Sequence, residues 1–352
     1  MVIAPLSPVF LGVSARTAGP LVRALAENPP FDVDSALQTA RDWGACAHSP
    51  ATGGTRELWE ALATVAAHDL GVARTIEPHL DALAILEQAG EASADNDATW
   101  GVFAAEGGDD PLTATELPDT DLMSSGWLLS GTKPWCSLAG RLSDALVSAH
   151  VGGGERRLFA VSLTAKGVRA DEGGWHARGL AEIPSGPVRF DAVVARPVGD
   201  AGWYLSRPGF AWGGIGVAAC WFGGAVGVAR AVYARAAAGS AGPFLLMHLG
   251  AIDELLESAR RALAEAAGLL DVGEATGEAG SLLASRVRAT VARAAEEILE
   301  RAGHALGPAP LALDEEHAKR VADLQLYLRQ YHAERDQASH GGALARAGES
   351  PW

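Results

Sequence analysis

The chain has 352 residues, of which 48% are hydrophobic and 20% charged, and this composition is typical of a folded protein rather than a disordered one. Its length is sufficient for two or three packed domains. The formal net charge of −15, without a cluster of Lys and Arg, argues against a nucleic-acid partner. The cysteines lie far apart (Cys46, Cys136 and Cys220), which argues against disulfides and a structural zinc site and favours a cytoplasmic location.

Residues 1–97 are predicted to form a helical domain. The stretch from Thr55 to Gly90 is rich in Ala and Leu, and its apolar residues recur at helical spacing. We expect Thr55 to cap the start of this helix and Gly90 to end it. A polar, turn-rich segment at 91–99 then indicates a domain boundary.

Residues 98–200 are predicted to form a β-domain, because short apolar runs alternate there with Gly-rich turns. This pattern is typical of an antiparallel sandwich or barrel. The predicted strands lie within the segments 99–105, 126–135, 144–151, 156–163 and 187–198.

Residues 201–352 are predicted to form a four-helix bundle. Its first helix includes 21 uncharged residues from Gly209 to Ala229, a length that is sufficient to span a bilayer. Seven of these residues are glycine, however, so we expect a helix buried by other helices and no membrane contact. The fold class is therefore α+β, with helices, a sheet and a bundle in that order. The remaining bundle helices are expected within 244–270, 281–303 and 314–339.

Two segments of the predicted β-domain carry the most specific pattern. The first, VFAAEGGDD, runs from Val102 to Asp110, and the second, LLSGTKPWCSLAG, runs from Leu128 to Gly140. In acyl-CoA dehydrogenases, a strand ending in a Thr-Glu-Pro-like turn precedes a strand with the pattern Asn-Gly-x-Lys-x-Trp-Ile-Thr. The chain resembles that superfamily in its domain order and in the register of Gly131, Lys133, Trp135 and Ser137.

The resemblance implies a bound FAD whose ring system lies at these two segments. A flavin ring needs a flat apolar neighbour and hydrogen-bond donors at its polar edge. We expect Trp135 to supply the flat surface, and Ser137, two residues further along a strand, to point the same way. Backbone groups of Ala105, Glu106 and Cys136 are expected to add polar contacts. The alternative is that Trp135 fills the core of the β-domain and that Ser137 faces water.

Several positions depart from the superfamily pattern. The Thr that hydrogen-bonds the flavin in that superfamily corresponds to Ala105, which has no hydroxyl. The Gln-x-x-Gly-Gly turn that meets the FAD pyrophosphate corresponds to residues 300–304, so Gly303 and His304 are the implied contacts. Glu300 brings a negative charge toward that dianion. The resemblance thus implies FAD, with the ring side of the site better matched than the ADP side.

The catalytic base of the superfamily is also replaced. Dehydrogenation of an acyl thioester requires a carboxylate that removes the α-proton. The Glu with this role corresponds to Tyr331, with His332 beside it and Glu334 as the nearest acid. Glu334 is a candidate relocated base, and His332 is a candidate for the role that His has in flavin monooxygenases of this fold. Both residues also suit a solvated helix face, and His79 is a further candidate from the N-terminal helices.

Three functions follow from these patterns. The first is an FAD-dependent oxidoreductase acting on an acyl-CoA or acyl-carrier thioester. The second is a flavin-dependent monooxygenase on the same fold, and the third is a non-catalytic scaffold or binding protein. The segment from Trp135 to Ser137 favours the first two, and the missing Glu favours the last two. We also expect a homodimer or homotetramer, because the uncharged helix needs more cover than one chain easily gives.

Overall fold

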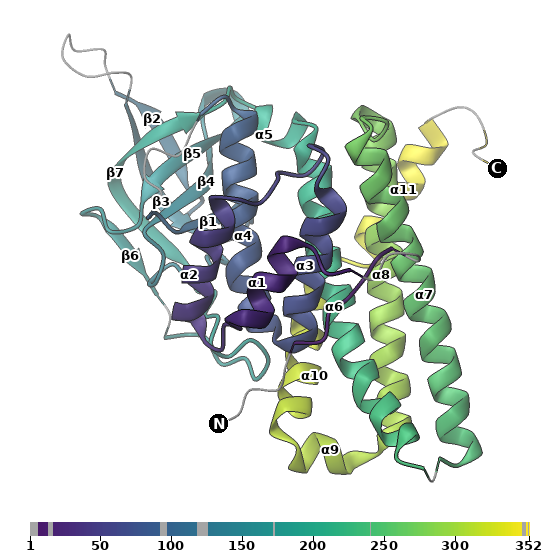
Figure 1. The fold of residues 1–352 in the computed structure, drawn as a ribbon. Helices are drawn as coiled ribbons and strands as arrows, with labels where there is room; N and C mark the ends of the chain where they lie inside the picture. Colours follow the sequence, from purple (N-terminus) through teal and green to yellow (C-terminus); the bar gives the residue numbers. More distant parts are fainter. Residues whose placement is uncertain are drawn as a thin grey trace.

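The computed structural model describes residues 6–12, 17–91, 97–117, 126–171, 173–239, 241–346, 350 and 352. Its helices and strands form three groups along the chain. In Figure 1 the strands lie on one side, the first helices lie beside them, and the later long helices lie on the other side.

The N-terminal group contains α1 (Pro20–Glu27), α2 (Val33–Gly44), α3 (Thr55–His68) and α4 (Leu70–Gln88). The prediction of one helix from Thr55 to Gly90 is wrong, because the chain breaks it at Asp69. The Asp69 carboxylate accepts hydrogen bonds from the N–H groups of Gly71 and Val72 and so caps α4. Thr55 is the first residue of α3 and not its cap. Gly90 follows α4 with a φ of 74°, as expected for a helix end.

The described part of the middle region forms one seven-stranded sheet. Its strands are β1 (Trp100–Phe103), β2 (Thr113–Glu116), β3 (Trp127–Lys133), β4 (Asp144–His150), β5 (Arg156–Ser162), β6 (Val168–Ala170) and β7 (Val188–Val198). Neighbours pair in the order β1-β4-β2-β3-β7-β5, and β5 also pairs with β4, so the strands from β4 to β5 form a closed ring. The prediction of an antiparallel sheet is wrong in part, because β1 and β2 run parallel to β4.

Gly131 of the sequence motif has a structural role in this sheet. The pairing of β3 with β7 shifts register between Leu129 and Gly131, and Gly131 has a φ of 116°. A side chain there would lie 2.7 Å from the carbonyl oxygen of Pro111. Glycine is therefore needed for this bulge and for the close approach of the neighbouring segment.

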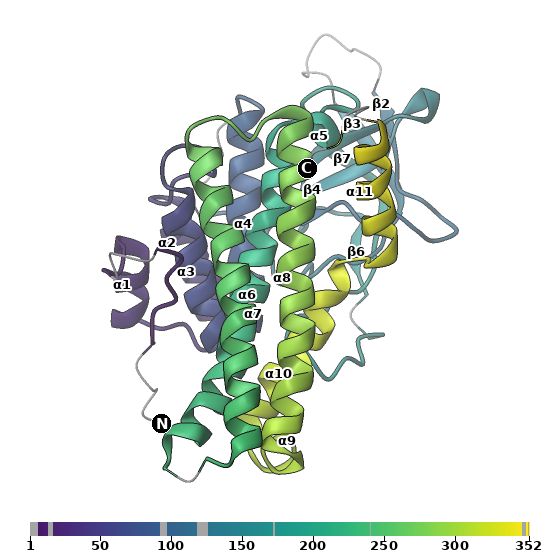
Figure 2. The same ribbon diagram turned by 90° about the vertical axis from the view of Figure 1, so that its right-hand side faces the viewer.

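The C-terminal group contains α5 (Trp203–Ser206), α6 (Gly209–Ala237), α7 (Pro243–Asp271), α8 (Gly277–Leu306), α9 (Pro308–Leu313), α10 (Glu315–Tyr327) and α11 (Glu334–Arg346). The first three predicted bundle helices correspond to α6, α7 and α8. The fourth is broken, because a 3-10 turn at Leu328–Gln330 follows α10 and Ala333 has a φ of 40° before α11 begins. Figure 2 shows α9 at one end of the bundle, where it links α8 to α10.

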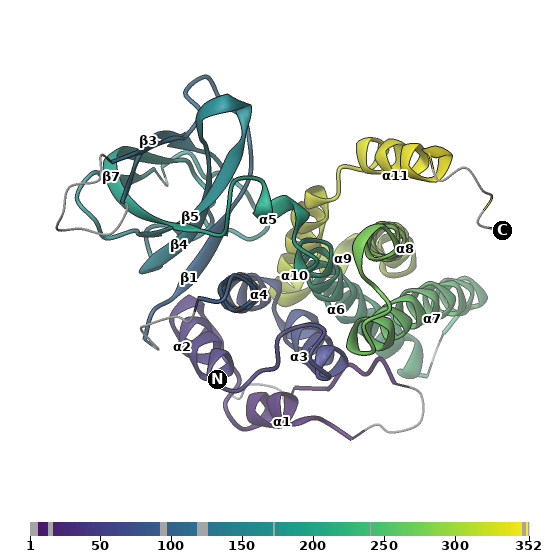
Figure 3. The same ribbon diagram turned by 90° about the horizontal axis from the view of Figure 1, so that it is seen from above.

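Helix α6, which includes the 21 uncharged residues, is buried by other helices, as predicted. It packs against α3, α4, α7, α8 and α10, as the view in Figure 3 shows. Its length and composition would suit a membrane span, but 78% of its most apolar window is buried within the protein. A β-carbon at Gly223 would lie 2.2 Å from the carbonyl oxygen of Ala63, and one at Gly227 would lie 2.6 Å from that of Ala67. The glycines therefore permit the close contact of α6 with α3.

Candidate functional site

The predicted flavin segment is a turn and not a strand at its key residues. β3 ends before this point, and Trp135 and Leu138 both have a φ of 58°. The expectation that Trp135 and Ser137 point the same way from a strand is therefore wrong. The turn is held by main-chain hydrogen bonds from the N–H groups of Cys136 and Leu138 to carbonyl oxygens of the 184–186 segment.

Trp135 projects outward from this turn. Its side chain is 62% exposed, so the alternative that it fills the core of the β-domain is wrong. A bulky residue in the left-handed region costs about 1–2 kcal/mol, and such conformations cluster at functional sites. Cys136 is buried instead, and burial raises the pKa of its thiol to about 12, so this thiol stays protonated. The turn thus offers the flat indole of Trp135 to a planar ligand.

Ser137 is hydrogen-bonded to Ser185 and Arg74. The two hydroxyl oxygens lie 2.7 Å apart, and Ser185 donates to the carbonyl oxygen of Ile183, so Ser137 donates to Ser185. Nη2 of Arg74, on α4, donates to the Ser137 oxygen at 3.1 Å. This arrangement ties α4 to the turn and places a positive charge next to it.

Glu106 is the centre of a charged cluster within the β-domain. One carboxylate oxygen accepts a 2.9 Å hydrogen bond from Nζ of Lys133 and lies 3.3 Å from Arg156, and the other lies 3.0 Å from Nε2 of His150. Burial opposes ionisation of Glu106, but Lys133 and Arg156 outweigh it and lower its pKa. Lys133, which matches the lysine of the superfamily pattern, therefore forms an internal ion pair with Glu106. Ala105 lies beside this cluster and is half-buried.

A series of cations and aromatic rings links α4 to the bundle. The guanidinium carbon of Arg74 lies 5.7 Å from the ring centre of Tyr327, which meets the ring of Trp221 edge-on at 6.3 Å. Arg288 lies 4.8 Å from the ring centre of Trp221. These side chains come from α4, α10, α6 and α8. Because each cation–aromatic contact contributes about 0.5–2 kcal/mol, the series helps to fix the face of α4 that carries Arg74.

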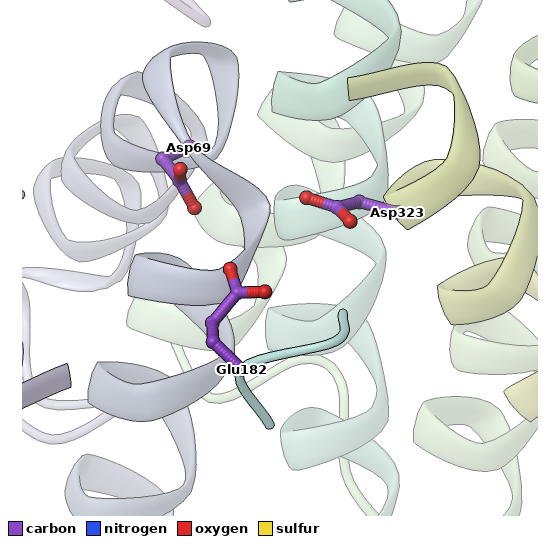
Figure 4. Close-up of side chains that lie close together, drawn as sticks. All are labelled: Asp69, Glu182 and Asp323. Atoms are coloured by element: carbon purple, nitrogen blue, oxygen red, sulfur yellow. The ribbon is translucent and has the colours of Figure 1, made fainter. Parts of the chain in front are cut away.

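Three carboxylates meet where the start of α4, the loop before β7 and α10 come together, and Figure 4 shows Asp69, Glu182 and Asp323 converging. Their spacing would suit a metal ion. However, Nζ of Lys319 lies 3.0 Å from Asp69 and 2.7 Å from both Glu182 and Asp323. Burial opposes its charge, yet the carboxylates raise the pKa of Lys319. Since this ammonium group supplies the positive charge, the cluster is a structural link between α4, α10 and the loop.

A cavity of about 560 Å³ lies between α3, α4, α6 and the segment that follows α2. Its apolar wall includes Trp59, Leu62 and Trp212. Among the described residues that line it, none is Lys or Arg, whereas four are acidic, namely Glu77, Asp81, Glu87 and Glu91. The cavity is therefore apolar on one side and negatively charged on the other.

Glu77 and Asp81 are the deepest acids of this cavity and lie one helical turn apart on α4. Glu77 is 7% exposed, and no described side chain forms a hydrogen bond or ion pair with it. Burial, together with the charge of Asp81, raises the pKa of Glu77 to about 7. Burial also raises the pKa of Asp81, whose nearest cation is Nη2 of Arg207 at 3.9 Å. The charges of Arg74 and Arg288 oppose the rise in the pKa of Glu77 without an ion pair to it among the described residues, and Asp81 is paired only through the 3.9 Å contact with Arg207.

The predicted catalytic residues lie at the break between α10 and α11. Tyr331, at the position of the superfamily base, is buried, and its hydroxyl accepts a 2.7 Å hydrogen bond from α11. His332 is exposed, with Nδ1 3.8 Å from the carboxylate of Asp336. Glu334 is exposed in the first turn of α11. Within the described parts of the chain, no hydrogen bond or ion pair joins His332 or Glu334 to the turn that carries Trp135.

His79 is a buried link between α4 and the sheet. Its Nδ1 accepts a 3.2 Å hydrogen bond from the N–H of Trp100. Burial and the charge of Arg41 lower the pKa of His79 to about 4, so the ring is neutral near pH 7. Its role here is structural.

Gly303 and His304, the implied pyrophosphate contacts, lie near the end of α8. A surface hollow of about 510 Å³ at this place is lined by two arginines, two histidines and three glutamates (Arg293, Arg301, His248, His304, Glu296, Glu297 and Glu300). Arg301 pairs with Glu297 within α8 at 2.5 Å. Arg329 pairs with Glu296, so the three glutamates are matched by Arg293, Arg301 and Arg329, and no excess of arginine charge is left for a pyrophosphate.

Comparison with known proteins was informative only at the level of structure. No model of a known protein family matches the sequence, and no curated protein matches it significantly. The dibenzothiophene monooxygenase TdsC from Paenibacillus sp. A11-2, in complex with FMN and indole, is 18% identical, with a TM-score of 0.73 over 91% of this chain and 90% of its own. KijD3, in complex with FMN and a dTDP-linked sugar, is 19% identical, with a TM-score of 0.74 over 92% and 88%.

A third similar structure is that of the methanesulfinate monooxygenase MsuC from Pseudomonas fluorescens. It is 20% identical, with a TM-score of 0.71 over 96% of this chain and 99% of its own. These proteins have the acyl-CoA dehydrogenase fold. The chain therefore has this fold too, as the resemblance predicted.

Sequence reasoning missed Arg74, Glu77 and Asp81. The signal that would have found them is their spacing, since three charged residues fall at i, i+3 and i+7 on one face of an otherwise apolar helix. A charged face within an apolar helix indicates either solvent or a polar site. The structure shows that this face is largely buried.

Proposed function

We propose that the protein is a flavin-dependent oxidoreductase that uses FMN. The observation that carries this proposal is the exposed indole of Trp135 on a fixed turn, beside the cation of Arg74, in the acyl-CoA dehydrogenase fold. Two of the similar proteins, TdsC and KijD3, have been solved with FMN. A bound flavin supplies redox chemistry that no protein side chain can perform.

The residues present fit the ring half of a flavin. Trp135 provides the flat apolar surface, and Arg74 provides hydrogen-bond donors and positive charge for the polar edge of the ring. Ser137 and Ser185 hold Arg74 and the turn in place through their hydroxyl network. The predicted contacts from the backbone of Cys136 remain part of this proposal.

The residues present do not fit the ADP half of FAD. In the hollow that contains His304, Arg301 and Arg329 are paired with Glu297 and Glu296, so they are not available to bind a pyrophosphate, and Glu300 adds a negative charge. FMN carries a single phosphate and no adenine nucleotide, so it makes no demand on this hollow. We therefore propose FMN in place of the FAD that the sequence resemblance implies.

The reaction type that we propose is monooxygenation. The position of the thioester dehydrogenase base holds Tyr331, which is buried and hydrogen-bonded within the protein. Thioester dehydrogenation is a second candidate, because Glu77 has a pKa of about 7 and such a value suits a general base. The cavity lined by Glu77 contains no Lys or Arg among its described residues, however, and the phosphates of CoA would be repelled by its acids.

One experiment separates the three functions. The protein is loaded with FMN, octanoyl-CoA is added without oxygen, and the visible absorbance of the oxidised flavin is followed. We expect no bleaching, and we expect labelled dioxygen to enter a product when reduced FMN and a panel of amines and thioethers are supplied. Bleaching by octanoyl-CoA would establish the dehydrogenase instead. Absence of flavin binding would leave the non-catalytic scaffold.

A further inference from the structure

We propose that the cavity between α3, α4 and α6 binds a small organic cation, namely a protonated amine with an apolar body. Its ammonium group would lie at Glu77 and Asp81, and its apolar part would lie against Trp59 and Trp212. The identification of this ligand as the substrate rests on the proposed function. The binding itself does not depend on a flavin.

The charge balance of the cavity supports this ligand class. Two of its four acids have partners within the protein, because Glu91 forms an ion pair with Arg196 and Glu87, which keeps its charge, accepts a hydrogen bond from Ser49. Glu77 has no such partner although it is more than nine-tenths buried. A buried carboxylate without a partner is costly, and a cation in the cavity would remove that cost.

Asp81 strengthens the negative charge at the same place. Arg207, its nearest cation, lies 3.9 Å away and donates a shorter hydrogen bond of 2.8 Å to Gln88. A β-carbon at Gly213 of α6 would lie 2.8 Å from the Asp81 carboxylate, so glycine is needed for the close approach of α6 to this group. Asp81 would therefore add its charge to the attraction of an ammonium group held at Glu77.

The walls of the cavity suit the apolar part of an amine. Trp59 and Trp212 offer aromatic rings, which attract cations as well as apolar groups. Nε1 of Trp59 is buried without a hydrogen-bond partner in the described structure. A β-carbon at Gly216 would meet only this nitrogen, at 3.7 Å, so the space beside Gly216 is open. A volume of about 560 Å³ is sufficient for a ligand of ordinary drug or metabolite size.

Helix α4 lines the cavity and also contacts the proposed flavin site. Glu77 follows Arg74 by three residues, nearly one helical turn, and Arg74 donates to Ser137. A ligand held at Glu77 therefore lies on the helix that also carries the polar contact to the Trp135 turn.

Isothermal titration calorimetry of the full chain, without flavin and at pH 8.5, tests this inference. The two probes are cyclohexylamine, which is largely protonated at this pH, and cyclohexanol, which has the same shape without the charge. We expect saturable one-to-one binding of the amine, with the alcohol about tenfold weaker or more. Glu77→Gln and Asp81→Asn are each expected to weaken the amine by about tenfold. Glu254→Gln, an exposed position on α7, is the matched control and should leave binding unchanged.

A further variant, Gly216→Leu, fills the cavity without changing its charge and should abolish binding of both probes. Circular dichroism establishes that each variant is folded. Equal binding of amine and alcohol, or unchanged amine binding in the Glu77 variant, would overturn the inference, as would the absence of saturable amine binding. Flavin binding is measured separately on the same samples. Amine binding without flavin binding would retain the cation site and refute the proposed function. Flavin binding without amine binding would refute the cation site and retain the proposed function.

Discussion

Replacing Glu77 by Gln is expected to stabilise the protein at alkaline pH. Glu77 is buried among charged and titratable groups from several elements, namely Arg74 and Asp81 on α4, Tyr204 on α5, Cys220 on α6, Arg288 on α8 and Tyr327 on α10. Gln has nearly the same shape as Glu but cannot ionise. The substitution therefore removes the cost of a buried negative charge and leaves the packing in place.

The pKa of Glu77 in the folded protein sets the pH range in which the wild type loses stability and the size of that loss. Burial raises this pKa from its ordinary value of 4.5 to about 7. Between these two pH values the unfolded chain is ionised at Glu77 and the folded protein is not, so the stability of the wild type falls as pH rises through this range. Each pKa unit corresponds to about 1.4 kcal/mol, so the total loss is about 3 kcal/mol and is complete above pH 7.

Urea unfolding at pH 5.5 and pH 8.5, followed by circular dichroism, measures this effect. The advantage of Glu77→Gln over the wild type is expected to grow by about 2 kcal/mol between the two pH values, since part of the window lies below pH 5.5. Glu254→Gln is again the control and should show no such growth. An advantage that does not change with pH would refute the reasoning, because it would mean that Glu77 titrates alike in the folded and unfolded states.

Other positions provide further tests. Gly223→Ala is expected to lower the free energy of unfolding in urea by about 1–3 kcal/mol, because its methyl group would lie 2.2 Å from the Ala63 carbonyl oxygen. Gly250→Ala is the control, since a β-carbon there meets nothing within 4 Å. Equal effects of the two substitutions would contradict the α3–α6 contact. Lys319→Met is expected to lower the free energy of unfolding by about 1–3 kcal/mol, because Asp69, Glu182 and Asp323 would lie together without a counter-ion. Unchanged stability would contradict the role of Lys319 in linking α4, α10 and the loop before β7. The expected homodimer or homotetramer no longer rests on α6, which one chain buries, but on the exposed apolar side chains of Phe244, Leu246 and Met247 at the start of α7. A monomer at micromolar concentration in light scattering would refute this expectation.

Much of the fold follows from hydrophobic patterning, and the exceptions have identifiable causes. All five predicted strands are present because each is an apolar run between turns. β2 and β6 were missed because they are short and largely exposed, which leaves no apolar run. The break at Asp69 was missed because the apolar periodicity continues across it, and the break at Ala333 was missed because neither Gly nor Pro marks it.

The candidate site could be predicted only where its residues are close together in the sequence. The register of Gly131, Lys133 and Trp135 located the turn, although it did not reveal that Trp135 leaves the strand. Arg74 and Glu77 are more than fifty residues away from that turn in the sequence, and their partners are brought to them by tertiary packing. No local pattern specifies such contacts, so the cation cavity becomes visible only in the folded chain.

Titration of the purified protein with FMN and with FAD, followed by quenching of flavin fluorescence, tests the central claim most directly. We predict stoichiometric binding of FMN and binding of FAD that is about tenfold weaker or more. Trp135→Ala is predicted to weaken the binding free energy of FMN by about 1–3 kcal/mol, because the stacking surface is lost. Trp352→Ala, at an exposed tryptophan outside the helices and strands, is the control and should leave FMN binding unchanged. Failure to bind either flavin, or unchanged FMN affinity in Trp135→Ala, would contradict the account.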